Sequence, residues 1–146
     1  MQFKSFNSAL ESLVTAAKRS KVKGDQLVRN DTAFLTDWEK QLTTITNADI
    51  RSSSEARRTE VSKQFDAANN RYVEAQDALR SLIDYLQDIR RSLSTDLTAN
   101  GIEAVKPLVS NANTTASKVK AALEQANTDL SALSTQMSSA RGPTAK

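Results

Sequence analysis

The stretch "VSKQFDAANNRYVEAQDALRSLIDYLQDIRRSL", residues 61–93, decides the fold of this chain. Its apolar residues follow one another at alternating spacings of four and three, the heptad period of a left-handed coiled coil. Ile83 and Tyr85 flank this seam and widen it, as a bundle of more than two helices requires. The pattern therefore predicts one long helix that packs on at least two others. The seam consists of Val61, Phe65, Ala68, Tyr72, Ala75, Leu79, Leu82, Leu86, Ile89 and Leu93.

A second seam with the same spacing occupies the C-terminal third of the chain. Between the two seams lies "TANG", residues 98–101, and we expect Asn100-Gly101 to supply the left-handed residue that ends the preceding helix. Pro107 predicts a kink or a fresh helix start, because proline cannot donate to the preceding turn. The second seam consists of Ile102, Val105, Val109, Ala112, Ala116, Val119, Leu123, Ala126, Leu130, Leu133 and Met137.

The N-terminal third has a less regular seam. Its two halves are separated by eleven residues, Ala17 to Val28, a stutter that locally unwinds a supercoil. Gly24, in "KVKGDQ", falls inside this interval. We expect a continuous but imperfect helix, with a break at Gly24 as the alternative. The seam consists of Phe3, Phe6, Leu10, Leu13 and Ala17, and then of Val28, Leu35, Trp38, Leu42 and Ile45.

Together the three seams predict an all-α fold, an elongated antiparallel three-helix bundle with up-down-up order and coiled-coil-like packing. A chain of 146 residues is long enough for one domain with its own core. We expect a single domain over residues 1–138 and a frayed tail over 139–146. The predicted helices span about residues 2–45, 50–98 and 102–138.

The composition argues against catalysis. The chain has no cysteine and no histidine, which removes thiolate chemistry, Cys-based metal sites and the usual general base near neutral pH. We therefore expect no catalytic, cofactor-binding or metal-binding residues, no cofactor and no small-molecule substrate. No run of eighteen apolar residues predicts a membrane span. The opening "MQFKSFNSALESLVTAAKR" lacks the apolar stretch of a signal peptide.

A basic cluster is a candidate binding site. Lys18, Arg19, Lys21 and Lys23 lie close together in the sequence and could contact anionic lipid or nucleic acid. No aromatic residues alternate with them, and the formal net charge is only +3. A solvated helix face is the favoured interpretation, and anion binding is the alternative.

A second basic cluster lies in "TNADIRSSSEARRTEV", residues 46–61, which contains Arg51, Arg57 and Arg58. Near a helix N-terminus these arginines could form an anion site. The favoured interpretation is structural, because antiparallel packing brings this segment beside Trp38 near the end of the first helix. We predict that Arg58 lies near Trp38 or pairs with Asp37 or Glu39.

The runs "WEKQLTTITNADIRSSSEARRTEV" and "LSTDLTANGIEAVKPLV" resemble a domain-of-unknown-function family of bacterial exported helical proteins, many of them lipoprotein-like or periplasmic. The resemblance covers about residues 35–135. It implies a helical protein of the periplasm or cell envelope. We therefore expect a structural spacer or protein-interaction module with a protein partner or self-association. The resemblance depends on Trp38-Glu39, Ile50-Arg51, Ser54-Glu55, Arg57-Arg58, Phe65, Tyr72 and Asp96-Leu97-Thr98.

Overall fold

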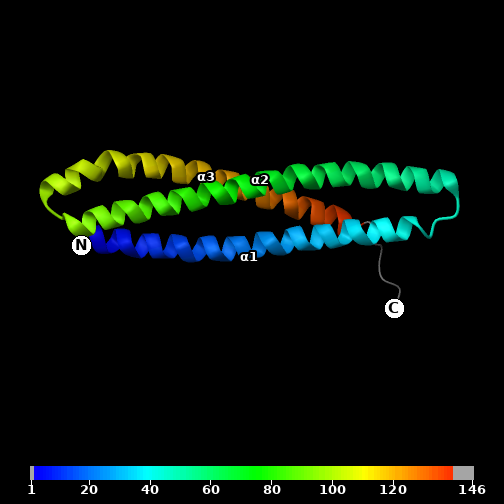
Figure 1. The fold of residues 1–146 in the computed structure, drawn as a ribbon, viewed down its shortest axis with the longest axis horizontal. Coiled ribbons are helices and arrows are strands. Elements are labelled where there is room, and N and C mark those ends of the chain that lie inside the picture. The colour runs from blue at the N-terminus through cyan, green and yellow to red at the C-terminus, as the bar shows by residue number, and fades with distance from the viewer. Residues whose placement is uncertain (1, 140–146) are drawn as a thin grey trace. The chain divides into compact units, whose positions relative to one another are not determined.

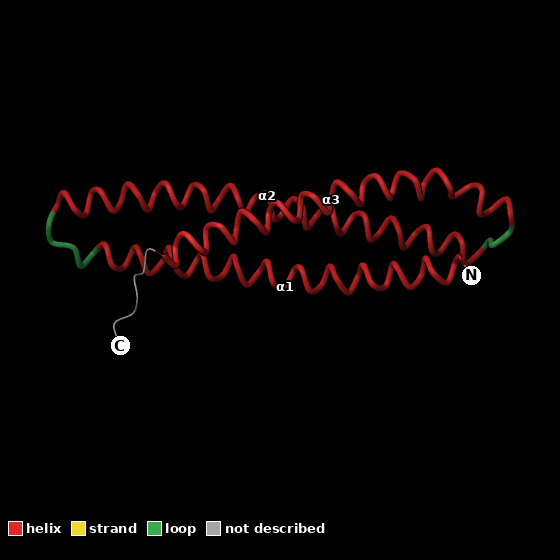
Figure 2. Tube along the Cα trace, turned by 180° about the vertical axis from the view of Figure 1, so that it is seen from behind, coloured by secondary structure: helices red, strands yellow, loops and turns green. Residues whose placement is uncertain are grey.

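The computed structural model describes residues 2–139 and forms three helices. They are α1 (Gln2–Leu42), α2 (Ala48–Thr95) and α3 (Ala99–Ser139), shown in Figure 1. Within residues 2–139 there is no strand, and the loops in Figure 2 are the two short connections between helices. The prediction of an all-α antiparallel three-helix bundle is confirmed. The predicted frayed tail, residues 139–146, lies outside the described residues except for the last residue of α3.

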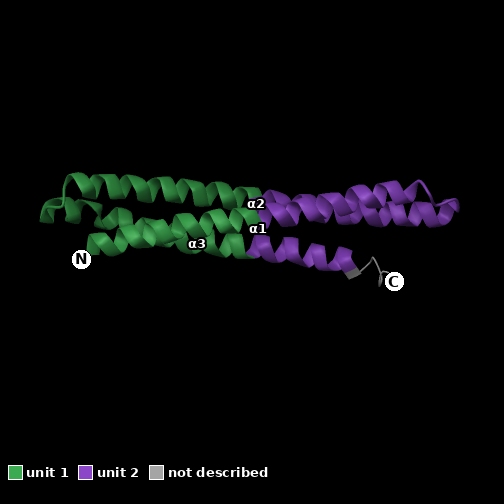
Figure 3. Cartoon of the chain, turned by 90° about the horizontal axis from the view of Figure 1, so that it is seen from below, with its two compact units in different colours: residues 1–22, 73–124 green, residues 23–72, 125–146 purple. Residues whose placement is uncertain are grey.

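The chain divides into two compact units, and each contains a segment of all three helices (Figure 3). Unit 1 comprises residues 1–22 and 73–124, and unit 2 comprises residues 23–72 and 125–146. In each unit the three segments share an apolar core. The prediction that residues 1–138 form one domain stays a prediction. The buried core of unit 1 includes Leu79, Leu82, Ile89, Leu93, Val105, Ala112 and Val119, and that of unit 2 includes Leu35, Val61, Phe65, Ala68, Tyr72, Ala126, Leu130, Leu133 and Met137.

The heptad seams point inward, as predicted. Nine of the ten α2 seam residues are buried, and the tenth, Leu86, is half-buried against the core of unit 1. In α3 the prediction is wrong for Ile102, which is 41% exposed. Ile102 lies in the first turn of the helix, directly after the connection, whereas the next seam residue, Val105, is buried.

The α1–α2 connection begins earlier than predicted. α1 ends at Leu42 rather than near Ile45, because the amides of Thr43 and Thr44 bond three residues back to the carbonyls of Lys40 and Gln41, at 3.2 and 3.0 Å. The hydroxyls of both threonines donate to the same carbonyls, at 2.6 and 2.7 Å. These bonds satisfy acceptors that a helix end leaves free, so the helix can stop here without a glycine.

Asn47 caps the start of α2. Its Oδ1 accepts the backbone N–H of Asp49 at 3.1 Å and of Ile50 at 3.0 Å. These are the first amides of the helix, which have no partner within it. The cap places the start of α2 at Ala48, two residues before the predicted boundary.

The α2–α3 connection corrects the prediction for Asn100 and Gly101. Both residues lie in the first turn of α3, and the φ angle of Gly101 is outside the left-handed region. Side chains make the turn instead: Thr98 donates to Asp96 Oδ1 through its amide (3.0 Å) and hydroxyl (2.6 Å). The Thr98 hydroxyl also accepts the Gly101 amide at 3.2 Å, as an N-cap does. Gly101 is needed for space, since a Cβ there would lie under 3.0 Å from the Asp96 carbonyl oxygen and carboxyl group.

Two residues that could have interrupted a helix do not. α1 runs through Gly24 without a break, which confirms the continuous helix that the sequence favoured. α3 runs through Pro107, so of the two predicted alternatives the fresh start is wrong, and the kink stays a prediction. Val105 and Ala112, on either side of the proline, are both buried in the same core. Burial of the seam on both sides outweighs the loss of one backbone hydrogen bond.

Candidate functional site

The polar groups with the most specific geometry lie in the core of unit 2, at positions where α1 faces the other helices. Gly24 and Asp31 both occupy the contact face of α1, and both are buried. Val28 lies between them on the same face and packs against the core. Burying a glycine or a carboxyl group here requires a specific partner, because neither fills an apolar layer by itself.

The partner of Gly24 is the ring of Tyr72 on α2. A Cβ at position 24 would lie closer than 3.0 Å to Cε2, Cζ and the hydroxyl oxygen of that ring. Tyr72 is only 4% exposed, and its hydroxyl donates to Asp25 Oδ1 at 2.9 Å. The glycine therefore makes room for the aromatic ring, and the neighbouring carboxyl group satisfies the buried hydroxyl.

The partner of Asp31 is Ser134 on α3. The serine hydroxyl donates to Asp31 Oδ1 at 2.6 Å, while Oδ2 is buried and has no hydrogen-bond partner among the described residues. Asp31 as a whole is 1% exposed. Burial raises the pKa of Asp31 above its usual value, and the bond from Ser134 offsets part of that rise. This hydrogen bond links α1 to α3.

Arg58 and Trp38 connect α1 to α2 near their common connection. The Arg58 guanidinium donates from Nε to the Leu35 carbonyl at 3.1 Å and from Nη2 to Glu39 Oε2 at 3.0 Å. The predicted pairing of Arg58 with a carboxylate at the end of α1 is therefore confirmed for Glu39. One turn before Arg58, Ser54 Oγ accepts the Trp38 indole N–H at 3.0 Å. Both residues act here as links between helices.

Two of the three arginines proposed as an alternative anion site make contacts within the protein. Arg51 donates from Nε and Nη2 to the carbonyl of Ile45, at 3.0 and 2.8 Å, which ties the connection to α2. Arg57 is exposed on α2, and Arg58 makes the contacts described above. A groove of about 610 Å³ beside Arg51 and Arg58 is also lined by carboxylates, which disfavours an anion there. They belong to Glu39 and Glu55.

The four basic residues of the cluster on α1 lie on two different sides of the helix. Lys18, Arg19, Lys21 and Lys23 are all exposed. At 3.6 residues per turn, Lys18 and Lys21 lie about 60° apart, and Arg19 and Lys23 about 40° apart on another side of the helix. Lys18 and Lys21 line a groove together with Arg80 of α2, whereas Arg19 and Lys23 do not. The four residues that the sequence groups together are thus two separate pairs.

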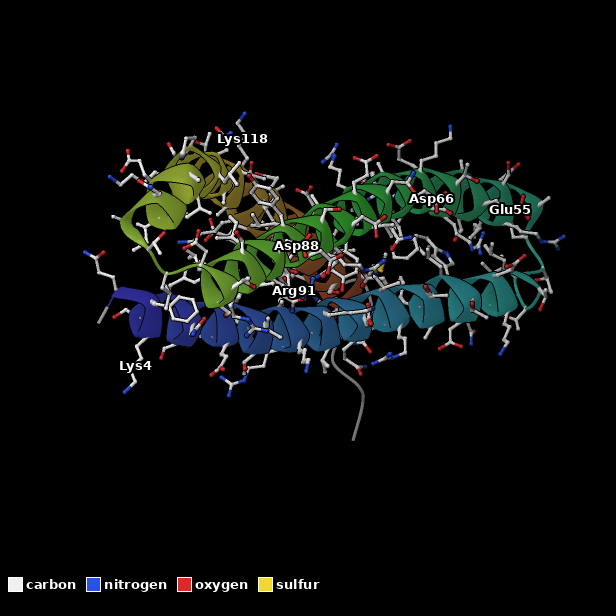
Figure 4. All side chains as sticks on the ribbon, turned by 60° about the vertical axis from the view of Figure 1, so that its left-hand side comes forward. Lys4, Glu55, Asp66, Asp88, Arg91 and Lys118 are labelled. Carbon is white, nitrogen blue, oxygen red and sulfur yellow. The ribbon has the colours of Figure 1, made fainter. Side chains whose placement is uncertain are left out.

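Other charged side chains lie on the outer surface of the helices. In Figure 4 the labelled Lys4, Lys118 and Glu55 project away from the ribbon. Asp88 and Arg91 form an ion pair one turn apart on α2. Within the described part of the chain, no three His, Cys, Asp or Glu side chains lie together in a way that could hold a metal ion. In the same residues no helix is both long and apolar enough to cross a bilayer.

These contacts define a helical-bundle protein in which buried polar groups join the three helices. The chain belongs to the family described as "Protein of unknown function (DUF2959)", whose sequence profile matches residues 1–137. Membership of a domain-of-unknown-function family, implied by the resemblance over about residues 35–135, is thereby confirmed. No curated protein and no solved structure matches the chain significantly.

The heptad pattern did not predict the two polar contacts of unit 2, Tyr72 with Asp25 and Ser134 with Asp31. A signal for one of them was present, because Val28 and Leu35 are seven residues apart and Asp31 lies at the seam position between them. Asp31 thus replaces an apolar seam residue. A single polar residue at a core position of a helical assembly often determines which helices pair, and in which register. No comparable signal marks Ser134, which lies beside Leu133 rather than on the α3 seam.

Proposed function

We propose that this protein is a non-enzymatic helical module that acts as a structural spacer or protein-interaction module in the bacterial cell envelope. The envelope location is supported by the family resemblance. The interaction role is supported by one structural observation: large apolar side chains are exposed at the α2–α3 connection. Leu97 is 52% exposed and Ile102 is 41% exposed, and they are five residues apart. Exposed apolar residues that lie together often mark a contact surface.

The surroundings of Leu97 and Ile102 favour a protein contact. Within the connection Thr98 hydrogen-bonds to Asp96 and to Gly101. Such bonds reduce the conformational freedom that the two side chains would lose on binding. Asp31, the one buried carboxyl group described above, serves a helix contact rather than an open site. The surface of the bundle is then the part available for partners, either a second copy or another protein.

Photo-crosslinking in cells of the native organism tests this proposal. A photoreactive amino acid at position 102 should give a specific adduct that is absent when it replaces Lys118, which is exposed on the same helix. The double variant Leu97→Ser/Ile102→Ser should lose the partner or the self-association measured by sedimentation. Val22→Ser is the matched control, because Val22 is 68% exposed and lies on α1. Equal crosslinking at positions 102 and 118, with no change in sedimentation, would contradict the proposal.

A further inference from the structure

A groove between α1 and α2 in unit 1 combines an apolar floor with a cationic rim. Its volume is about 310 Å³, at the lower end of the range for small-molecule sites. The floor comes from both helices. The apolar residues lining the groove are Val14, Ala17, Leu79 and Ile83.

Three cationic side chains border this floor. Lys18 and Lys21 come from α1 and Arg80 from α2, and all three are exposed. Arg80 is also 3.7 Å from Asp77, but both partners of this pair are largely exposed, so the pair is weak and can exchange for another anion. The rim therefore presents three cationic side chains from two helices.

Gln76 adds a hydrogen-bond donor to the same groove. It is one of the lining residues, and its Nε2 is buried without a hydrogen-bond partner among the described residues. A buried donor without an acceptor is costly, which favours rotation of the amide toward a ligand oxygen. Together with Lys18, Lys21 and Arg80, this donor suits a ligand that carries a negatively charged, oxygen-rich group.

The size of the groove limits the kind of ligand. The lining residues span 14–21 of α1 and 76–83 of α2, about two helical turns or roughly 10 Å on each helix. A partner helix needs a longer apolar track to bind stably. A flat bilayer surface does not reach the floor of a concave groove. A linear alkyl chain with an anionic head matches the floor and the rim together.

We propose that this groove binds a single-chain anionic amphiphile of the alkyl carboxylate class. The alkyl chain lies along Val14, Ala17, Leu79 and Ile83, and the carboxylate lies between Lys18, Lys21 and Arg80. This site is distinct from the contact surface at the α2–α3 connection. Either site can therefore fail its test without affecting the other.

Titration of the ¹⁵N-labelled protein, residues 1–146, with laurate below its micellar concentration tests the site. Backbone amide shifts should concentrate in residues 14–21 and 76–83. The variant Lys18→Gln/Lys21→Gln should weaken laurate binding about tenfold, because two exposed ion pairs are lost. Arg19→Gln/Lys23→Gln is the matched control, since it removes the same charge from the same helix but not from the groove. Its affinity should stay within about twofold of the unmodified protein.

The floor and the head group are tested separately. Val14→Thr keeps the shape of the side chain but makes it polar, and it should weaken laurate binding several-fold. Dodecyl maltoside, which has the alkyl chain without the charge, and acetate, which has the charge without the chain, should both fail to shift these amides. Circular dichroism shows whether each variant is folded, and Arg80→Gln provides an independent rim variant.

Four results would overturn the proposal. They are absence of laurate binding, equal weakening by the two double variants, equal binding of dodecyl maltoside, and equal amide shifts with acetate. A final experiment measures binding of the protein to phosphatidylglycerol vesicles. If the protein binds these vesicles but not monomeric laurate, a membrane surface is the ligand and the groove assignment is wrong. If laurate binds, and of the two double variants only Lys18→Gln/Lys21→Gln weakens its binding, the groove assignment is supported regardless of whether the protein also binds the vesicles.

Discussion

Replacing Gly24 by alanine should destabilise unit 2, although the same change stabilises most helices. Alanine is about 1 kcal/mol more favourable than glycine inside a helix, because it loses less backbone entropy. At position 24 the new methyl group would lie closer than 3.0 Å to three atoms of the buried Tyr72 side chain. The ring must move, so overpacking costs about 1–3 kcal/mol. If the hydroxyl also loses its bond to Asp25, roughly another 1 kcal/mol is lost.

The expected net effect is therefore a loss of roughly 2 kcal/mol in the free energy of unfolding. Guanidinium denaturation monitored by tryptophan fluorescence measures this loss. The chain has a single tryptophan, Trp38, and it lies in the same compact unit as Gly24 and Tyr72. The midpoint should fall while the slope of the transition stays the same.

Two tyrosine variants separate the contributions. In a Tyr72→Leu background the clashing ring atoms are absent, so Gly24→Ala should stabilise the protein by about 1 kcal/mol, the ordinary helix effect. In a Tyr72→Phe background the ring stays and only the hydroxyl is lost, so Gly24→Ala should still destabilise. The double-mutant cycle with leucine should thus give a coupling of roughly 3 kcal/mol. If Gly24→Ala stabilises the protein by a similar amount in all three backgrounds, the Tyr72 ring does not pack against Gly24 as described.

Three further predictions concern the same unit and use the same Trp38 signal. Burial raises the pKa of Asp31 in the folded protein, so the stability that its neutral form contributes is fully present below the usual aspartate pKa and is lost as the pH rises through the raised value. Asp31→Asn should remove this pH dependence of the free energy of unfolding. Parallel pH profiles for the two proteins would contradict this prediction. Arg58→Lys should cost about 1–2 kcal/mol, since lysine cannot reach the Leu35 carbonyl and Glu39 together, and an unchanged denaturation midpoint would show that these bonds are unimportant. Asn47→Ala should cost about 1 kcal/mol through loss of the N-cap, while Asn47→Asp should retain most of the stability.

The sequence predicted the helices and their inward faces because heptad spacing depends only on neighbouring residues. Burying an apolar stripe stabilises the same three segments whatever the details of their partners. Leu79 and Leu130, both deep in the seams, are buried as this reasoning requires. The connections were harder to predict, because two local signals competed. Gly101 suggested the end of a helix, but Thr98 is also a good N-cap, and the cap determines where α3 begins.

The link between Asp31 and Ser134 could not be predicted for a different reason. The two residues are 103 positions apart, and α3 reaches α1 only after two connections whose lengths and geometry both affect the register. An error of one residue in either connection would rotate a different side chain toward Asp31. The sequence could indicate that Asp31 interrupts an apolar seam. The sequence could not indicate which hydroxyl donates a hydrogen bond to Asp31.

The contact between Gly24 and Tyr72 was within reach of the sequence. In an antiparallel helical hairpin the residue numbers of facing positions add to a nearly constant value, which the position of the connection determines. Asp25 with Tyr72 and Glu39 with Arg58 both add to 97. A connection predicted at about residues 46–49 gives nearly the same value, so it places Tyr72 opposite Gly24 to within one turn. Read in this way, the glycine is the complement of an aromatic residue on the facing seam. Its position opposite that aromatic residue is then a reason to expect a continuous helix, and no longer a reason to expect a break.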